Sequence, residues 1–233
     1  MRHADDQEIV ERARIILSIV PPAGAIAIAE RFAAPLKEKG PGPLFADCNA
    51  IGVPTVTKIA GLVEGAGAAF VDGSIIGGPP RGDDAGPTFY FAGRDAALLS
   101  ELTTYGLRVR VMDGPVGAAK ALKLSYAGIT KGLTALGATM ILAAERAGAG
   151  QALYDELAAS QAALLGRFAR SLPDMYPKAY RWVAEMQAIA DFVGAQLPEA
   201  KIFEGTAGLY ERLADDVAGP NTERSILDAF FRR

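Results

Sequence analysis

The sequence predicts an α/β protein in two parts, a parallel-sheet domain followed by an all-helical domain that a long helix enters. Short apolar runs alternate with amphipathic segments through the first half, which is the pattern of strand-helix-strand units. After Gly117 only helical periodicity remains. The domain boundary is expected at Asp113-Gly114-Pro115, which divides the chain into residues 1–114 and 115–233.

Proline, glycine and polar capping residues bound the elements of the first half. A helix is predicted over residues 5–14, with Asp5 or Asp6 as its N-cap. Buried parallel strands over residues 15–20, 44–47 and 68–72 are separated by helices over residues 23–34 and 53–65. Strands over residues 88–91 and 107–111 flank a helix that begins near Asp95. The last strand alternates apolar residues with Arg108 and Arg110, which is typical of a sheet edge.

An apolar stripe at three- and four-residue spacing predicts a long helix at the start of the second half. The stripe consists of Leu122, Tyr126, Ile129, Leu133, Leu136 and Met140. The helix is expected to end near Arg146, with Gly148 as its C-cap. Further helices are predicted over residues 151–171, 176–196, 198–217 and 223–231. These helices carry more apolar surface than one helical layer covers, so we expect a homodimer.

Composition excludes several classes of function. The formal net charge of −3 and pI of about 5.3 provide no basic field for nucleic acid. The sequence contains one cysteine and one histidine, too few for a disulfide framework or for a metal site built from these residues. The pair Asp83-Asp84 offers too few oxygen ligands for a hard cation. The polar, acidic start is unlike a signal peptide, and the uncharged stretch over residues 132–144 is too short to span a membrane. We therefore expect a cytoplasmic protein with no metal and no membrane partner.

Three segments carry a resemblance to a known superfamily. They are Phe70-Val71-Asp72-Gly73-Ser74-Ile75-Ile76-Gly77-Gly78, Thr88-Phe89-Tyr90-Phe91-Ala92-Gly93, and Gly117-Ala118-Ala119-Lys120-Ala121-Leu122-Lys123-Leu124-Ser125-Tyr126-Ala127-Gly128. In this order they resemble the 6-phosphogluconate dehydrogenase and β-hydroxyacid dehydrogenase superfamily. The third segment is similar to a bacterial branch described by a phosphogluconate-dehydrogenase-type C-terminal domain. The resemblance implies an NAD(P)-dependent oxidoreductase that transfers hydride to or from a small polar substrate (a hydroxy acid, sugar acid or imine).

The resemblance implies that the expected Rossmann-like domain lacks its N-terminal part. No G-x-G-x-x-G occurs in the sequence, and the strand over residues 15–20 looks like the fourth strand of the superfamily. Met1 is then an internal methionine or the start of a shortened chain. Binding of NAD or NADP is expected to be impaired. The alternative function is that of a non-catalytic remnant that acts only as a helical dimerisation module.

The resemblance implies a catalytic lysine early on the long helix. Lys123 follows Gly117 at the spacing that the superfamily keeps, and Lys120 is the alternative. A lysine in a desolvated site can exchange a proton during hydride transfer, because burial lowers its pKa. The superfamily's asparagine position is occupied here by Ala127 and its serine position by Ile76. These departures predict a different substrate and make imine reduction a rival to alcohol oxidation.

The remaining candidate residues lie at predicted strand ends. Cofactor contacts are expected from Val20, Pro21, Pro22 and Asn49, and substrate contacts from Ser74, Gly77 and Gly78. Ligands bind at the carboxyl edge of open α/β sheets, and glycine lets a backbone approach a carboxylate or phosphate. Each group also has a structural interpretation, since asparagine caps helices and Gly-Gly before proline forms turns.

Overall fold

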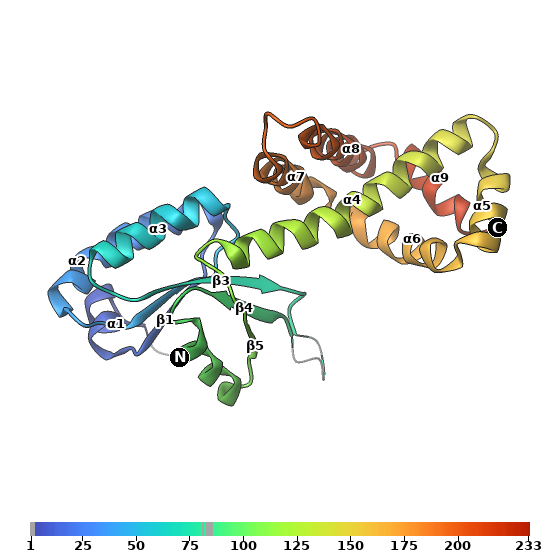
Figure 1. Ribbon diagram of the computed structural model, residues 1–233. Coiled ribbons are helices and arrows are strands. Elements are labelled where there is room, and N and C mark those ends of the chain that lie inside the picture. Colours follow the sequence, from blue (N-terminus) through green and yellow to red (C-terminus); the bar gives the residue numbers. More distant parts are fainter. Residues whose placement is uncertain (1–2, 81, 83–85) are drawn as a thin grey trace. The chain divides into compact units, whose positions relative to one another are not determined.

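The computed structural model describes residues 3–80, 82 and 86–233, and the chain forms two compact units, Met1–Leu124 and Ser125–Arg233 (Figure 1). Met1, Asp83 and Asp84 lie outside the described residues. The sequence predicts the boundary at residue 114, whereas in the structure it lies inside helix α4 (Ala118–Arg146), so that about the first two turns of α4 belong to the first unit.

The first unit is a five-stranded sheet in the order β1-β2-β3-β4-β5. Its strands are β1 (Ile15–Ser18), β2 (Leu44–Asp47), β3 (Phe70–Ile76), β4 (Thr88–Ala92) and β5 (Arg108–Val111). β1, β2 and β3 are parallel, β4 runs antiparallel to β3, and β5 is parallel to β4. The predicted parallel α/β sheet is therefore confirmed, with one antiparallel pairing after the third strand. As predicted, β5 lies at an edge, with Arg108 and Arg110 exposed.

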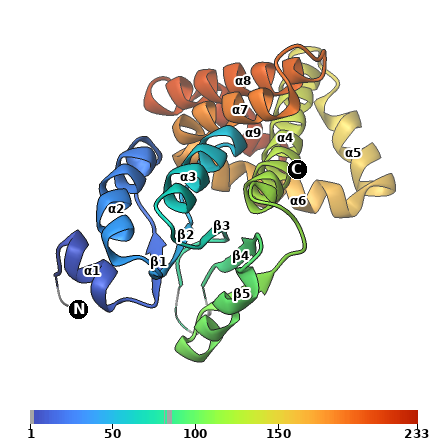
Figure 2. The same ribbon diagram turned by 60° about the vertical axis from the view of Figure 1, so that its left-hand side comes forward.

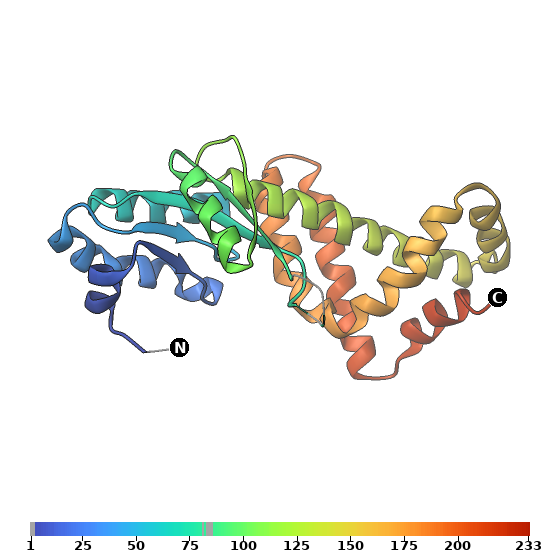
Figure 3. The same cartoon turned by 90° about the horizontal axis from the view of Figure 1, so that it is seen from below.

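Helices cover both faces of this sheet. On one side lie α1 (Asp6–Arg12), α2 (Ala25–Lys39) and α3 (Val53–Gly65), which bury an apolar cluster against Ile16, Phe45 and Phe70. A short 3₁₀ turn, η1 (Pro22–Gly24), leads into α2. On the other side, η2 (Ala96–Tyr105) packs against Val71 and Phe91, and it lies in front of the sheet in Figure 3. The segment predicted to be a helix after Asp95 is thus a 3₁₀ helix.

The second unit contains helices only, apart from the connections between them. Its elements after α4 are α5 (Gly150–Ser160), α6 (Ala162–Met175), η3 (Tyr176–Lys178), α7 (Ala179–Val193), α8 (Ala200–Ala218) and α9 (Thr222–Phe230). α7 and α8 lie side by side (Figure 2). The single helix predicted over residues 151–171 is wrong, because the chain leaves helical geometry at Gln161, where φ is −137° and ψ is 43°.

The buried face of α4 combines small residues with Leu124, Ile141 and Leu142, and most of the predicted apolar stripe lies outside it. Gly128 lies against Phe203, where an added Cβ would be 3.2 Å from the ring. Gly137 lies against Phe168, where the same distance would be 2.6 Å. Aromatic rings of other helices thus reach the α4 backbone, and most of the predicted stripe remains exposed on the opposite side.

One helix in the described residues, α4, is long and apolar enough to cross a membrane by length and composition. In the most apolar segment of this helix, 44% is buried within the protein. Core helices of soluble proteins meet the same two criteria, so this property of α4 carries little weight.

Candidate functional site at the carboxyl edge of the sheet

One face of the sheet changes from apolar to polar along its parallel strands. Phe45 of β2 pairs in register with Phe70 of β3, and both side chains lie in the apolar core. Two residues further on, Ser18, Asp47 and Asp72 pair in register across β1, β2 and β3. Because side chains alternate between the faces of a strand, these polar groups lie on the same face as the phenylalanines. All three are buried, so each needs partners inside the protein.

Asn49 connects the ends of β1 and β2. Its side-chain nitrogen donates to Ser18 Oγ at 3.0 Å and to Asp47 Oδ2 at 2.6 Å, and its Oδ1 accepts from the Val20 amide at 2.7 Å. Only 2% of Asn49 is exposed. Both amide hydrogens of its side chain are therefore used within the protein. Asn49 fixes the backbone that leads into Pro21.

Lys120 is fully buried and lies between two carboxylates. Its Nζ donates to Asp47 O and Asp47 Oδ1, both at 2.9 Å, and to Gly73 O at 2.5 Å. Asp72 Oδ1 forms an ion pair with the same Nζ at 3.5 Å. An ammonium group has three N–H donors, and here each one has a protein oxygen as its acceptor. Lys120 is therefore held as an ion-paired cation with no hydrogen left for a ligand.

Asp72 caps the start of α4 from the middle of β3. Its Oδ2 accepts from the amides of Gly117 and Ala119, both at 2.9 Å, and from that of Lys120 at 3.4 Å. The partial positive charge at this helix N-terminus is thus matched by a carboxylate of the chain itself. Burial raises the pKa of Asp72 above its ordinary value, although the nearby Lys120 ammonium and the amide hydrogen bonds act in the opposite direction.

Gly73 and Cys48 form the opposite side of the same strand ends. A Cβ at Gly73 would lie 2.7 Å from Cys48 Sγ, 2.9 Å from the Phe91 ring and 3.1 Å from Asp47 O, so only glycine fits without displacing its neighbours. Burial raises the pKa of the Cys48 thiol to about 12. Lys120 and Lys123 oppose this rise, which places the positive charge of Lys123 within electrostatic reach of the thiol. Cys48 is consequently a packing residue.

The predicted catalytic lysine, Lys123, lies in the second turn of α4 and is half-buried. It follows the fully buried Lys120 by three residues, which separates the two by about 60° around the helix axis and about 4.5 Å along it. The structure thus gives the two lysines different surroundings. The amine of Lys120 is saturated by protein oxygens, and Lys123 is the lysine with solvent-accessible surface.

The predicted cofactor residues Val20, Pro21 and Pro22 follow β1 at the carboxyl edge, where the two prolines are exposed. Asn49, which the sequence also predicts to contact the cofactor, accepts a hydrogen bond from the Val20 amide. The structure therefore brings these four residues together. Among them the prolines offer accessible surface, and the asparagine holds their backbone.

The predicted substrate residues are divided by burial. Ser74 pairs with Tyr90 of β4, is fully buried, and has a hydroxyl without a hydrogen-bond partner among the described residues. Gly77 and Gly78 follow the end of β3 and are exposed. Gly77 has a φ of +123°, and a Cβ there would lie 3.0 Å from Pro87 Cα, so this turn needs glycine. The glycines and the serine therefore do not form one accessible surface.

Two residues central to this site, Asp47 and Asp72, were not selected from the sequence. Each lies in a short apolar strand, and the two strands are neighbours in the predicted sheet. Aspartates at matching positions of adjacent buried strands need a cation between them. Two aspartates at such positions, together with a lysine on the long helix that follows the sheet, could have indicated this buried ion pair from the sequence.

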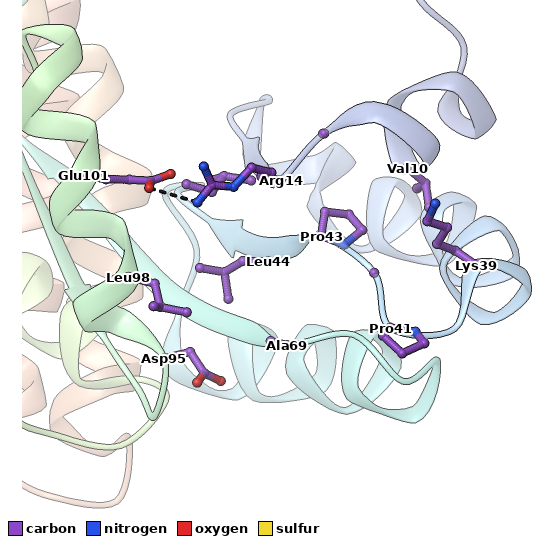
Figure 4. A pocket seen from close by; sticks show the side chains of 13 residues that line it. Val10, Arg14, Lys39, Pro41, Pro43, Leu44, Ala69, Asp95, Leu98 and Glu101 are labelled. Carbon is purple, nitrogen blue, oxygen red and sulfur yellow. Dashed lines mark hydrogen bonds and ion pairs between the residues drawn. The ribbon is translucent and has the colours of Figure 1, made fainter.

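Two hollows of the first unit lie at the opposite, amino edge of the sheet. The first, of about 420 Å³, is lined by Ile15, Leu44 and Leu98 and is bordered by the ion pair of Arg14 with Glu101 at 3.1 Å (Figure 4). The second, of about 590 Å³, is lined by residues preceding β3 and following β4 and β5. Within the described residues, no group of three or more histidine, cysteine or acidic side chains is placed to hold a metal ion.

Comparison with known proteins gives the site a context. The family described as a domain of unknown function, DUF1932, matches residues 144–213, inside the helical unit. A conserved protein of unknown function, whose structure was described as similar to 3-hydroxyacid dehydrogenases, has a TM-score of 0.79 at 23% identity, over 96% of this chain and 81% of its own. The chain has the fold of the 3-hydroxyacid dehydrogenases.

Other proteins with the 3-hydroxyacid dehydrogenase fold are similar over nearly the whole chain. A Mycobacterium tuberculosis 3-hydroxyisobutyrate dehydrogenase, described with L-serine, has a TM-score of 0.64 at 18% identity, covering 97% of this chain and 81% of that one. An imine reductase from Myxococcus stipitatus, in complex with NAD⁺, has a TM-score of 0.53 at 16% identity, covering 97% and 83%. The fold expected from the resemblance to the 6-phosphogluconate and β-hydroxyacid dehydrogenase superfamily is confirmed.

One curated relative is an uncharacterised 28.5 kDa protein of Methanothermus fervidus, encoded in the 5′ region of 7S RNA. It is 27% identical over 155 residues, which are 66% of this chain and 56% of that protein. The chain thus spans little more than half the length of this relative.

Proposed function

We propose that the chain belongs to an NAD(P)-dependent oxidoreductase that transfers hydride between the nicotinamide and a small polar substrate. The substrate class is a hydroxy acid, a sugar acid or an imine. The fold supports the reaction class, because a 3-hydroxyisobutyrate dehydrogenase and an NAD⁺-bound imine reductase both share it. The observation that carries the proposal for this chain is the anchoring of Lys120, three residues before Lys123 on α4, to main-chain oxygens at the end of β2 and in the middle of β3, on the side of the sheet where open α/β sheets bind ligands.

In this proposal Lys123 donates or accepts the proton that accompanies hydride transfer. Its side chain keeps solvent-accessible surface, whereas the neighbouring Lys120 ammonium has all three hydrogens bound by protein oxygens. A positioned lysine amine can act as the general acid or base for the proton that accompanies hydride transfer. An arginine at this position would keep its proton and is not a substitute.

The described residues fit the nicotinamide end of the cofactor better than its phosphates. The exposed Pro21 and Pro22 provide a rigid surface at the carboxyl edge, and Asn49 fixes the preceding backbone. When bound, the cofactor supplies or accepts the hydride. The sequence contains no G-x-G-x-x-G to hold a pyrophosphate, and the N-terminus of α4 is already capped by Asp72. We therefore propose weak binding of NAD or NADP by this chain.

For the substrate, we propose contacts from the exposed backbone of Gly77 and Gly78. Their position after β3 lets a carboxylate or other polar group approach the main chain closely. Ser74 lies earlier in the same strand and is buried, so its unpartnered hydroxyl cannot contact a substrate directly. It would reach a substrate only through a bound water or after a movement of the turn that follows β3.

We further propose a homodimer formed through the exposed stripe of α4. Tyr126, Ile129, Leu136 and Met140 are 53–70% exposed, and with Leu133 they recur at alternating three- and four-residue spacing. That spacing is the heptad pattern of a helix-helix seam, and it is self-complementary across a twofold axis. A cytoplasmic location, with no nucleic acid or membrane as partner, remains part of the proposal.

Single-turnover kinetics with Lys123→Ala tests the function. Hydride transfer to or from a panel of 3-hydroxy acids, sugar acids and cyclic imines is followed by nicotinamide absorbance. We expect Lys123→Ala to slow the chemical step by about 10²–10⁴-fold while cofactor affinity is unchanged, because acid-base assistance has that size. Lys58→Ala, on the exposed side of α3, is the matched control and should react at the wild-type rate. Equal rates in both variants would contradict the role of Lys123.

Titration calorimetry with NADH and NADPH separates this function from the alternative one. A measurable but weak affinity agrees with the oxidoreductase. No binding by a chain that sediments as a dimer would favour a helical dimerisation module, for which the exposed α4 stripe is the supporting observation. Ile129→Glu should then give a monomer, whereas Ile202→Glu, on an exposed site of α8 outside the stripe, should remain dimeric.

A further inference from the structure

Lys120 is unusual because a complete lysine side chain is buried with only 1% of its surface exposed. Lysine is almost never fully buried unless it is paired, and a buried ion pair is often no more stabilising than apolar residues of the same volume. Net stability therefore does not account for its presence. A buried pair does, however, fix the groups that it joins in one geometry.

We propose that Lys120 is the positioning residue for Lys123, holding the first turns of α4 against the end of β2 and the middle of β3. The inference rests on the proposed function in one respect, namely that Lys123 is the proton carrier. Lys120 itself touches no reacting atom in this arrangement, because its ammonium hydrogens are all donated to the protein.

The acceptors of Lys120 explain why it fixes the helix. Two of the three are main-chain oxygens, Asp47 O and Gly73 O, which belong to adjacent parallel strands. Main-chain oxygens cannot move away by side-chain rotation. The Nζ atom is thus fixed relative to the sheet backbone at the point where β2 ends, and the helix that carries it is fixed with it.

Asp72 adds a second attachment at the same turn. Its Oδ2 holds the amides of Gly117 and Ala119, and its Oδ1 faces Lys120 Nζ at 3.5 Å. The helix is therefore held by its backbone and by its side chain at once. Lys123 follows one turn later, about 4.5 Å along the axis, so its Cα inherits the position set by these contacts. Displacing a catalytic group by about 1 Å can cost about 10²-fold in rate.

The test uses the full chain with Lys120→Met, which keeps the length and apolar volume of the side chain but removes its ammonium. Amide hydrogen exchange is measured for Ala121–Leu124 in α4 and for Val56–Val63 in α3, which lies in the same unit. Acetic anhydride labelling of the Lys123 amine is measured in parallel, relative to the exposed Lys201. The matched control is Lys58→Met.

We expect Lys120→Met to speed exchange at Ala121–Leu124 at least about tenfold more than at Val56–Val63, because the helix start opens locally. Labelling of Lys123 should rise at least threefold relative to Lys201, and Lys58→Met should change neither quantity. An equal rise in exchange over both helices, with unchanged labelling of Lys123, would mean that Lys120 serves global stability only and would overturn the proposal.

If Lys120→Met fails to fold, Asp47→Asn is the deciding variant. It removes one charged partner of Lys120 and leaves the Asp47 carbonyl in place, so the same local changes are expected at smaller size. Their absence would overturn the proposal equally. Neither readout uses cofactor or substrate, so local release of α4 without any hydride transfer would refute the oxidoreductase alone. Normal hydride transfer by a Lys120→Met chain would refute the positioning role alone.

Discussion

Replacing Lys120 by methionine should destabilise the sheet unit by about 3–5 kcal/mol, because one buried cation between two carboxylates is lost. Asp47 and Asp72 would remain buried at 0% exposure without a counter-charge, and breaking a buried pair from one side typically has this cost. Whole domains are stable by about 5–15 kcal/mol, so the change is a large share of the total. With a urea m-value of about 2 kcal/mol/M, the unfolding midpoint should fall by about 2 M.

The chain contains a separate probe for each unit, which makes the measurement specific. Its single cysteine, Cys48, is buried beside the ion pair, and its single tryptophan, Trp182, lies in α7 of the helical unit. Thiol labelling against urea therefore follows the first unit, and tryptophan fluorescence follows the second. Lys120→Met should lower the thiol midpoint and leave the fluorescence midpoint nearly unchanged.

A double variant supplies the control for this reasoning. Asp47→Asn combined with Lys120→Met removes both members of the closest pair, so its cost should be smaller than the sum of the two single costs. A loss below about 1 kcal/mol for Lys120→Met, or strict additivity in the double variant, would refute the claim that the buried ammonium is needed to compensate these carboxylates.

Three further outcomes are expected. Cys48, with its pKa raised to about 12 by burial, should resist thiol reagents at pH 8 until the unit unfolds; rapid labelling of the native chain would contradict its packing. Burial raises the pKa of Asp72 above 3.8, so the folded protein binds the Asp72 proton more tightly than the unfolded chain does, and the wild-type protein loses stability as the pH rises from about 4 through the folded pKa. Asp72→Asn has no such proton to lose. In urea titrations, the difference in unfolding free energy between the wild type and Asp72→Asn should therefore become smaller as the pH rises over this range. Gly137→Ala should destabilise the helical unit by about 1–3 kcal/mol in the fluorescence assay, because its Cβ would lie 2.6 Å from the Phe168 ring; an unchanged midpoint would mean that the ring has room to move.

Prolines and glycines at the ends of helices and strands explain which elements could be predicted from the sequence. The strand over residues 44–47 and the helix over residues 53–65 have the predicted bounds, because prolines and glycines mark their ends. The break at Gln161 carries no such mark, so two helices were predicted as one. Similarly, the stripe on α4 was visible, but the choice of its buried face depended on Phe168 and Phe203, which reach the helix backbone from other parts of the chain.

The candidate site was predictable in location but not in detail. The carboxyl edge and the two lysines of α4 follow from the strand pattern and the resemblance. The different environments of Lys120 and Lys123 do not, since they depend on Asp47, which is 73 positions away from Lys120. Spacing along one helix cannot reveal which of two lysines meets a carboxylate from a distant strand.

The capping of α4 by Asp72 has a consequence for the order in which the chain folds. Most helices are capped by residues within a few positions of their start, whereas this cap comes from 45 positions earlier in the chain. The first turn of α4 therefore gains its partner only after β3 has paired within the sheet. We expect this turn to form late in folding, after the sheet and after the central turns of the same helix, since contacts distant in sequence require loop closure first.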